Sequence, residues 1–116
     1  MGVTATLADY AIDTPGGFLT QQLSDATRHM FMDTLALMVA GSRDRPGMIA
    51  LKTLDAWGGA PEATVVGSPT KLPTPQAGFI NAVTAHSLEY DDNTLGVGHT
   101  SACMVPGCLA MAEKLD

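Results

Sequence analysis

The stretch "LALMVAG" (residues 35–41) decides the fold class, because it is apolar on nearly every side of a helix. It closes a longer pattern over residues 19–40, in which apolar side chains recur every three or four positions, as in an α-helix. Gly41 is a typical residue to follow the last turn of such a helix. A helix without a polar face is buried on more than one side. Asp33 and Thr34 would then lie in or near a core and would need polar partners.

Further helices and one short extended segment are predicted on both sides of this stretch. Helices are expected over residues 46–57, 75–90 and 102–115, the second with Thr74 as N-cap and Pro75 as its first residue. Near the N-terminus, a short amphipathic helix is expected to end in a turn over residues 13–17. "EATVVG" (residues 62–67) is short and β-branched, which is typical of an extended segment or an edge strand. The prediction is therefore one mostly α-helical domain.

The composition excludes several classes of function. The chain has 116 residues, a net charge of −6 and only six lysines and arginines. It lacks the basic surface of nucleic-acid-binding proteins, and a negatively charged membrane would not attract it. It shows neither a secretory leader nor the run of roughly 20 apolar residues that spans a bilayer. Cys103 and Cys108 have no partners at metal-site spacing, so we interpret them as reduced thiols of a cytoplasmic protein.

The candidate site lies in "AHSLEYDDNTLGVGHTSA" (residues 85–102), where three acids stand between two histidines. Asp91 and Asp92 would fall at the C-terminus of the predicted helix, where the helix dipole disfavours anions. Together with Glu89 they should repel one another and raise one another's pKa. His99 can fold back through the glycine-containing loop to pair with a carboxylate. Such a pair is typical of general acid–base catalysis.

Three other interpretations of this cluster stay open from the residues alone. Acids near a helix end are often a solvated face. Glu, Asp and His are also metal ligands, as in a metal-dependent hydrolase, but their spacing fits no standard motif and we assign no metal. His86 by itself is typical of a histidine satisfied by packing. Gly96 and Gly98 do not form a phosphate loop, since no Lys-Ser/Thr follows them.

Three segments in the observed order resemble the N-terminal region of the MmgE/PrpD family. They are "MDTLALMVAG", "EATVVGSPTKLPTPQAGFINAVTAHSLEYDD" and "GHTSACMVPGCLAMAE". The family includes 2-methylcitrate dehydratases, cis-aconitate decarboxylases and iminodisuccinate epimerases. The resemblance covers residues 7–115, almost the whole chain, and favours an active-site segment over a solvated acidic face.

The resemblance implies a larger enzyme with its active site between two domains. Residues 1–116 would be the N-terminal part of the mostly helical domain, without the α+β lid domain and the C-terminal helices. Family members act at carbon next to a carboxylate of a small di- or tricarboxylate, by dehydration, decarboxylation or epimerisation. They generally need no metal or organic cofactor, and homodimers are common.

The resemblance also suggests roles for single residues. Glu89 falls where relatives carry an active-site acid, and His99 matches a histidine that Pro-Ser usually follows, here Thr-Ser. We predict that His99 is the catalytic acid or base and that Asp92 or Glu89, also counted as catalytic, orients it. The expected substrate-binding residues are Asp91, Asn93, at a position where Thr is frequent, and the neighbouring Thr94.

The cluster provides no cation to receive a substrate carboxylate. We therefore predict half an active site, inactive alone, with a second copy or the remainder of the enzyme as its partner. The alternative is a non-catalytic helical module that binds a partner and retains the acidic loop as a relic. His99→Ala would separate the two, because a relic should tolerate it.

Overall fold

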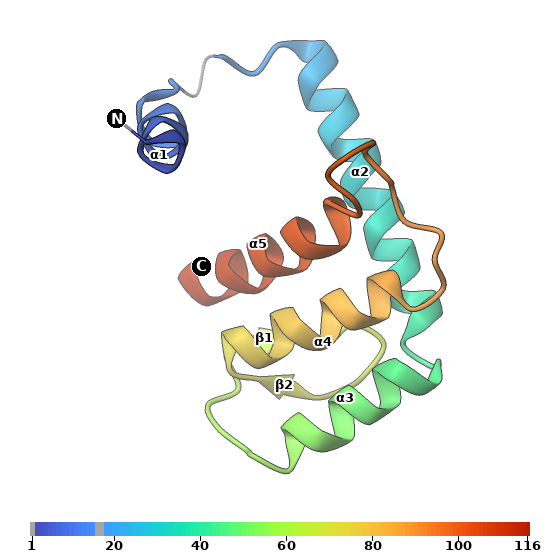
Figure 1. Ribbon diagram of the computed structural model, residues 1–116. Coiled ribbons are helices and arrows are strands. Elements are labelled where there is room, and N and C mark those ends of the chain that lie inside the picture. The colour runs from blue at the N-terminus through green and yellow to red at the C-terminus, as the bar shows by residue number, and fades with distance from the viewer. Residues whose placement is uncertain (1, 16–17) are drawn as a thin grey trace.

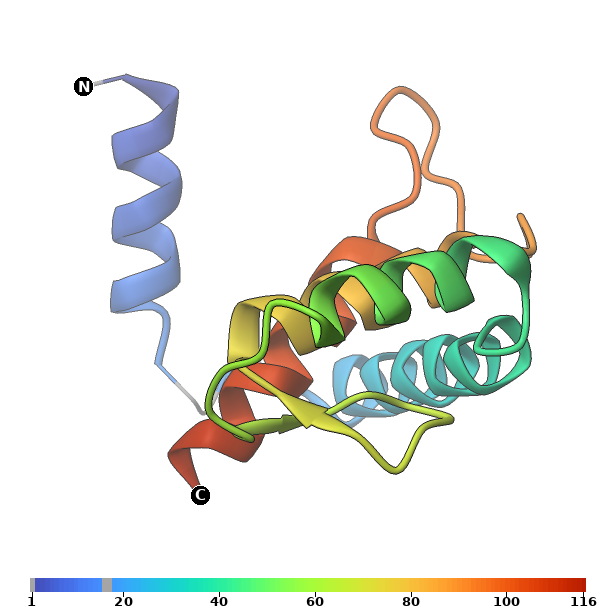
Figure 2. The same cartoon turned by 90° about the horizontal axis from the view of Figure 1, so that it is seen from below.

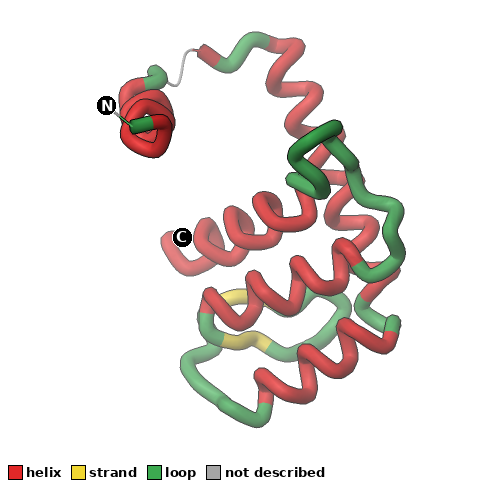
Figure 3. The backbone as a smooth tube through the Cα atoms, in the orientation of Figure 1, coloured by secondary structure: helices red, strands yellow, loops and turns green. Residues whose placement is uncertain are grey.

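Five helices and a small hairpin make up the described part of the chain, residues 2–15 and 18–116, in the computed structural model (Figures 1 and 3). The mostly α-helical prediction is confirmed. Gly16 and Gly17 of the predicted N-terminal turn lie outside the described residues. The elements are α1 (Val3–Asp13), α2 (Gln21–Gly41), α3 (Arg45–Asp55), β1 (Ala63–Thr64), β2 (Lys71–Leu72), α4 (Thr74–His86) and α5 (Ser101–Leu115).

Helix α4 lies at the centre of the fold, in contact with α2, α3, α5 and the hairpin (Figures 1 and 2). One apolar cluster joins α4 to α3, the hairpin and α5, and a second joins it to α2 and α5. Their buried members are Leu54, Ala63, Val65, Leu72, Ala77, Ile80 and Ala110 in the first, and Met38, Ala85, Ala102 and Val105 in the second. Because several members are alanines, the helices approach closely, and α4 holds the ends of α2 and α5 together.

Gly41 has a packing role that differs from the predicted one. It is the last residue of α2 and lacks the positive φ expected after a helix end. A Cβ placed on it would lie 2.9 Å from the Thr84 carbonyl carbon and closer still to the Thr84 carbonyl oxygen. The glycine is therefore required because α2 crosses the backbone of α4 at this point.

The two polar residues beside the apolar stretch of α2 have different environments. Thr34 is buried, as predicted, and its hydroxyl donates to the Met30 carbonyl oxygen at 2.8 Å. Asp33 is exposed, so its expected place in or near a core is wrong for the described chain. The same stretch is covered on one side, where Met38 is buried, while Val39 remains 58% exposed.

The predicted extended segment is confirmed as β1, and its partner is β2, which the sequence analysis missed. The strands pair antiparallel, with Ala63 opposite Leu72. The buried Asn81 of α4 holds the hairpin, because its Oδ1 accepts from Val66 N at 2.9 Å and its Nδ2 donates to the Thr64 carbonyl oxygen at 3.0 Å. One amide thus joins the hairpin to the central helix.

The N-terminus of α4 is capped by a residue distant in sequence. Thr74 was predicted as the N-cap, but Pro73 takes that position and Thr74 lies in the helix. The backbone N–H of Thr74 donates to Glu62 Oε2 at 3.1 Å, and its hydroxyl donates to the same oxygen at 2.9 Å. These bonds, with an ion pair to Lys114, lower the pKa of Glu62 to about 2. The carboxylate therefore occupies the positive end of the helix.

Helix α1 contributes no buried residue and is set apart from the other helices (Figure 1). Its apolar residues Leu7 and Tyr10 are 62% and 60% exposed. Among the described residues, no helix combines the length and apolar character needed to cross a membrane.

Candidate active site

The acidic cluster is built by a chain reversal between α4 and α5. Helix α4 ends at His86, four residues earlier than predicted, so Asp91 and Asp92 lie in the loop and not on the helix end. Glu89 has a φ of 56°, the left-handed conformation that turns the chain. Thr94 and Gly98 then pair as an antiparallel bridge, which brings the chain back to the start of α5. The reversal places His99 beside His86, with ring centroids 4.5 Å apart.

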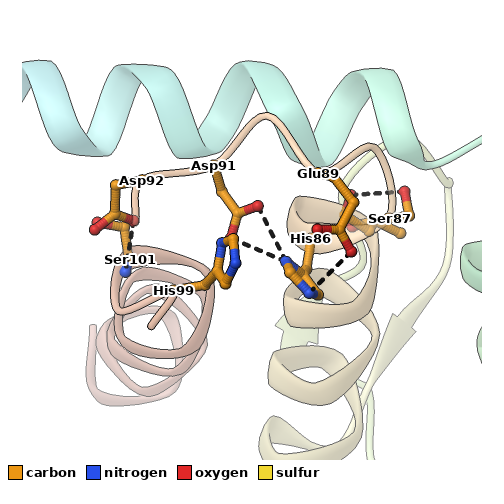
Figure 4. A network of polar contacts seen from close by, with 8 residues as sticks. His86, Ser87, Glu89, Asp91, Asp92, His99 and Ser101 are labelled. Carbon is orange, nitrogen blue, oxygen red and sulfur yellow. Dashed lines mark hydrogen bonds and ion pairs between the residues drawn. The ribbon is translucent and has the colours of Figure 1, made fainter. Parts of the chain in front are cut away.

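Asp91 lies between the two imidazoles, as Figure 4 shows. His86 Nδ1 is 3.0 Å from Asp91 Oδ1 and 3.1 Å from Oδ2. His99 Nδ1 is 3.1 Å from Asp91 Oδ2, an ion-pair distance, but the ring is not aligned for a hydrogen bond. The side chain of Asp91 is only 1% exposed. This carboxylate faces the imidazoles and not the solvent, and the substrate contact expected for it stays a prediction.

His86 is the member of the cluster that the sequence analysis did not assign to the site. Its hydrogen bond to Asp91 raises its pKa, while burial acts in the opposite direction, and the charges of Asp91 and Glu89 add to the rise. Its Nε2 lies 3.5 Å from Glu89 Oε1. Glu89 itself is 73% exposed and contacts His86, not His99.

Asp92 caps helix α5 instead of contacting His99. Its Oδ1 accepts from Ser101 N at 2.9 Å, and its Oδ2 accepts from the Thr100 hydroxyl at 2.8 Å. Burial acts to raise the pKa of Asp92, but these hydrogen bonds and the nearby His99 together lower it. The predicted orienting contact from Asp92 or Glu89 to His99 is therefore corrected, because Asp91 occupies that position.

Asn93 and Thr94 are exposed on the loop that leads away from Asp92. The backbone of Thr94 holds the loop closed, since its N–H donates to the Gly98 carbonyl oxygen at 3.0 Å. The substrate-binding role expected for these two residues stays a prediction.

Three of the six lysines and arginines are already engaged within the described chain. Lys71 pairs with Glu113, Lys114 with Glu62 and Arg28 with Asp25. The ion pairs of the cluster involve its histidines instead. Among the described residues, no lysine or arginine therefore forms an ion pair with the acids of the cluster.

Comparison with known proteins places the chain in a family. Residues 5–116 match the MmgE/PrpD N-terminal domain. The cis-aconitate decarboxylase of Homo sapiens is 31% identical over 100 residues, which cover 85% of this chain and 21% of that protein. The cis-aconitate decarboxylase of Mus musculus is 26% identical over 98 residues, covering 84% and 20%. The chain thus spans about a fifth of the length of these relatives, and no solved structure matches it significantly. The match over nearly all of its residues shows that this chain belongs to the MmgE/PrpD family.

Proposed function

We propose that this chain supplies the acid–base part of an MmgE/PrpD-type active site, acting next to a carboxylate of a small di- or tricarboxylate. The observation that carries the proposal is the pair of imidazoles, His86 and His99, gathered on the buried carboxylate of Asp91. Catalysis of the lyase type is favoured by the two relatives, each named cis-aconitate decarboxylase.

His99 is the proposed acid or base. An imidazole is well suited to proton transfer near neutral pH, and a neighbouring carboxylate fixes its tautomer and orientation. Asp91 takes the orienting role by its position, and Glu89 acts on His86 from the solvent side. Asn93 and Thr94 are proposed to contact the substrate from the exposed loop.

The described chain would be half of the site. Removing a proton next to a carboxylate also requires groups that stabilise the developing negative charge. The remainder of the enzyme, or a second copy of the chain, would supply these groups and the cations for the substrate. We therefore expect the 116-residue chain to show no turnover by itself.

The test is the enzymatic activity of a full-length protein, in which this chain is joined to the lid domain and the C-terminal helices of an MmgE/PrpD family member. Decarboxylation of cis-aconitate, dehydration of 2-methylcitrate and epimerisation of iminodisuccinate would each be assayed. His99→Ala should lower kcat by about 10²–10⁴-fold, the usual contribution of a general acid or base. His29→Ala, a change at an exposed histidine of α2, is the matched control and should leave kcat unchanged.

Two results would contradict the proposal. Equal activity of the His99→Ala and wild-type proteins would remove His99 from the chemistry. Turnover by the purified, monomeric 116-residue chain would show that the site is complete without further residues.

A non-catalytic helical module is the second candidate, and one surface favours it. The groove between α3 and α4 is lined mainly by apolar side chains, of which Ile49, Trp57 and Phe79 are more than half exposed. If this groove binds a partner protein, Phe79→Ser should weaken binding of that partner while His99→Ala has no effect. The opposite pattern would favour the enzyme.

A further inference from the structure

We propose that His86, Asp91 and His99 form a binding site for a divalent transition-metal ion of the Zn²⁺ class. Each residue offers one ligand atom, and the three atoms lie within 4.8 Å of one another. The ligands would be two imidazole nitrogens and one carboxylate oxygen, a combination that suits zinc, copper and nickel.

The distances are close to those that a metal requires. Zinc binds imidazole nitrogen and carboxylate oxygen at about 2.0–2.2 Å, so neighbouring ligand atoms of a tetrahedral site are about 3.4 Å apart. The two contacts of Asp91 with His86 and His99 are 3.0 Å and 3.1 Å. The two imidazole nitrogens lie within 4.8 Å of each other and would have to come closer to bind one ion, and both histidine side chains are partly exposed.

The metal-free cluster leaves one nitrogen without a partner. His99 Nδ1 is buried and accepts or donates no hydrogen bond within the described chain, although Asp91 is nearby. A buried polar atom without a partner is unfavourable. A metal ion would use the lone pair of this nitrogen and would also neutralise the carboxylate beside it.

Charge and exposure favour a cation at this position. Glu89 and Asp92 stand close to Asp91 in the sequence, and among the described residues the ion pairs of Glu89 and Asp91 are formed with histidines and not with lysine or arginine. The side chains of His86 and His99 are 43% and 29% exposed, which gives an ion a path from the solvent. Three protein ligands with an open side correspond to a site that keeps one coordination position for water or another ligand.

The proposal goes beyond the proposed function and does not depend on it. A metal held by His99 would take the nitrogen lone pair needed for proton transfer, so the ion would inhibit the acid–base chemistry. Binding of the metal can be measured on the 116-residue chain without any assay of turnover.

The experiment is titration of the chain with Co²⁺ and Zn²⁺. The exposed Cys103 and Cys108 would first be changed to serine, because thiolates bind both ions. Visible absorption of bound Co²⁺ reports the coordination geometry, and displacement by Zn²⁺ gives the zinc affinity. We expect one ion per chain with the intense absorption of a four- or five-coordinate cobalt site.

Single variants identify the ligands. Loss of an outer-shell partner of a metal site weakens metal affinity by about 10- to 100-fold, so loss of a direct ligand should weaken it by more. His86→Ala, His99→Ala and Asp91→Asn should each have this effect. His29→Ala is the matched control and should leave the affinity unchanged.

A second measurement covers the case in which a variant fails to fold. In the chain with intact histidines, Zn²⁺ should shift the imidazole NMR signals of His86 and His99 and leave those of His29 in place. Absence of stoichiometric binding, or a shift of His29 in place of the other two, would overturn the proposal. Unchanged affinity in a folded His86→Ala or Asp91→Asn variant would overturn it as well.

Discussion

Replacement of Gly41 by alanine should destabilise the fold and displace the end of α4 that carries His86. A Cβ at this position would lie 2.5 Å from Ser87 Oγ, 2.9 Å from the Thr84 carbonyl carbon and nearer still to the Thr84 carbonyl oxygen. Ordinary van der Waals contact begins at 3.4 Å. The backbone oxygen cannot move without the helix, so α2 and α4 have to separate. Overpacking of this kind costs about 1–3 kcal/mol.

A gain in helix propensity offsets part of this cost. Alanine in place of glycine stabilises a helix interior by about 0.5–1 kcal/mol. Because the clash involves backbone atoms, we take the upper part of the overpacking range and expect a net loss of about 2 kcal/mol. With a urea dependence of about 2 kcal/mol/M, the midpoint of unfolding should fall by about 1 M.

The matched control is Gly107→Ala in α5. Gly107 is exposed, and a Cβ there would meet no atom within 4 Å. This variant receives the helix-propensity gain without the clash, so its midpoint should rise by about 0.3–0.5 M. Both variants would be compared with the wild-type chain by urea unfolding, followed by far-ultraviolet circular dichroism.

Equal or greater stability of the Gly41→Ala protein would refute the reasoning, because it would mean that α2 and α4 do not cross closely at Thr84. A loss of equal size in Gly107→Ala would also contradict it, since steric contact with α4 would then not be the cause. In the Gly41→Ala protein, the NMR signals of His86 should shift more than those of His29.

Three further predictions concern caps, the hairpin and acid stability. Asp92→Ala should cost about 0.5–2 kcal/mol in thermal or urea unfolding, because it removes the cap of α5; Asp92→Asn keeps an acceptor and should cost less. Asn81→Leu should lower stability by about 1–3 kcal/mol for each of the two hairpin backbone groups it leaves unpaired, and an unchanged midpoint would contradict this role. Glu62 and Glu113 each have a pKa lowered to about 2. The chief cause is the pair of hydrogen bonds from Thr74 for Glu62, and the hydrogen bonds from Lys71 and Thr64 for Glu113. A lowered folded-state pKa stabilises the fold above the ordinary value of 4.5, so the melting temperature should fall as the pH drops from about 5 to 2. The double Glu→Gln variant should show a flatter profile over that interval.

Local pattern predicted the helices but not their ends. Apolar periodicity located α2, α3, α4 and α5, because helix formation depends on residues three and four positions apart. The capping residues were harder to predict from the sequence, because the carboxylate that caps α4 belongs to Glu62, on the other side of the hairpin. The strand at Lys71 was missed because a two-residue strand has no periodicity to detect.

The sequence located the cluster of titratable residues, but the contacts predicted between its side chains were incorrect. The residues between His86 and His99 were identified by the unusual density of titratable groups. Which carboxylate meets which imidazole depends on the reversal at Glu89, and a left-handed conformation at a non-glycine residue is not expected from local pattern. Asp91 therefore lies between the imidazoles, while its neighbour Asp92 caps α5.

By itself the sequence determined the mostly helical fold class, the resemblance to the family and the segment in which titratable groups gather. These features follow from short-range periodicity and from residue order, both of which can be read without coordinates. The tertiary structure decided that α4 is central, that Gly41 permits the close crossing of α2, and that two imidazoles share one buried carboxylate. Each of these depends on contacts between segments far apart in the chain, whose geometry is set by helix packing and not by local preference.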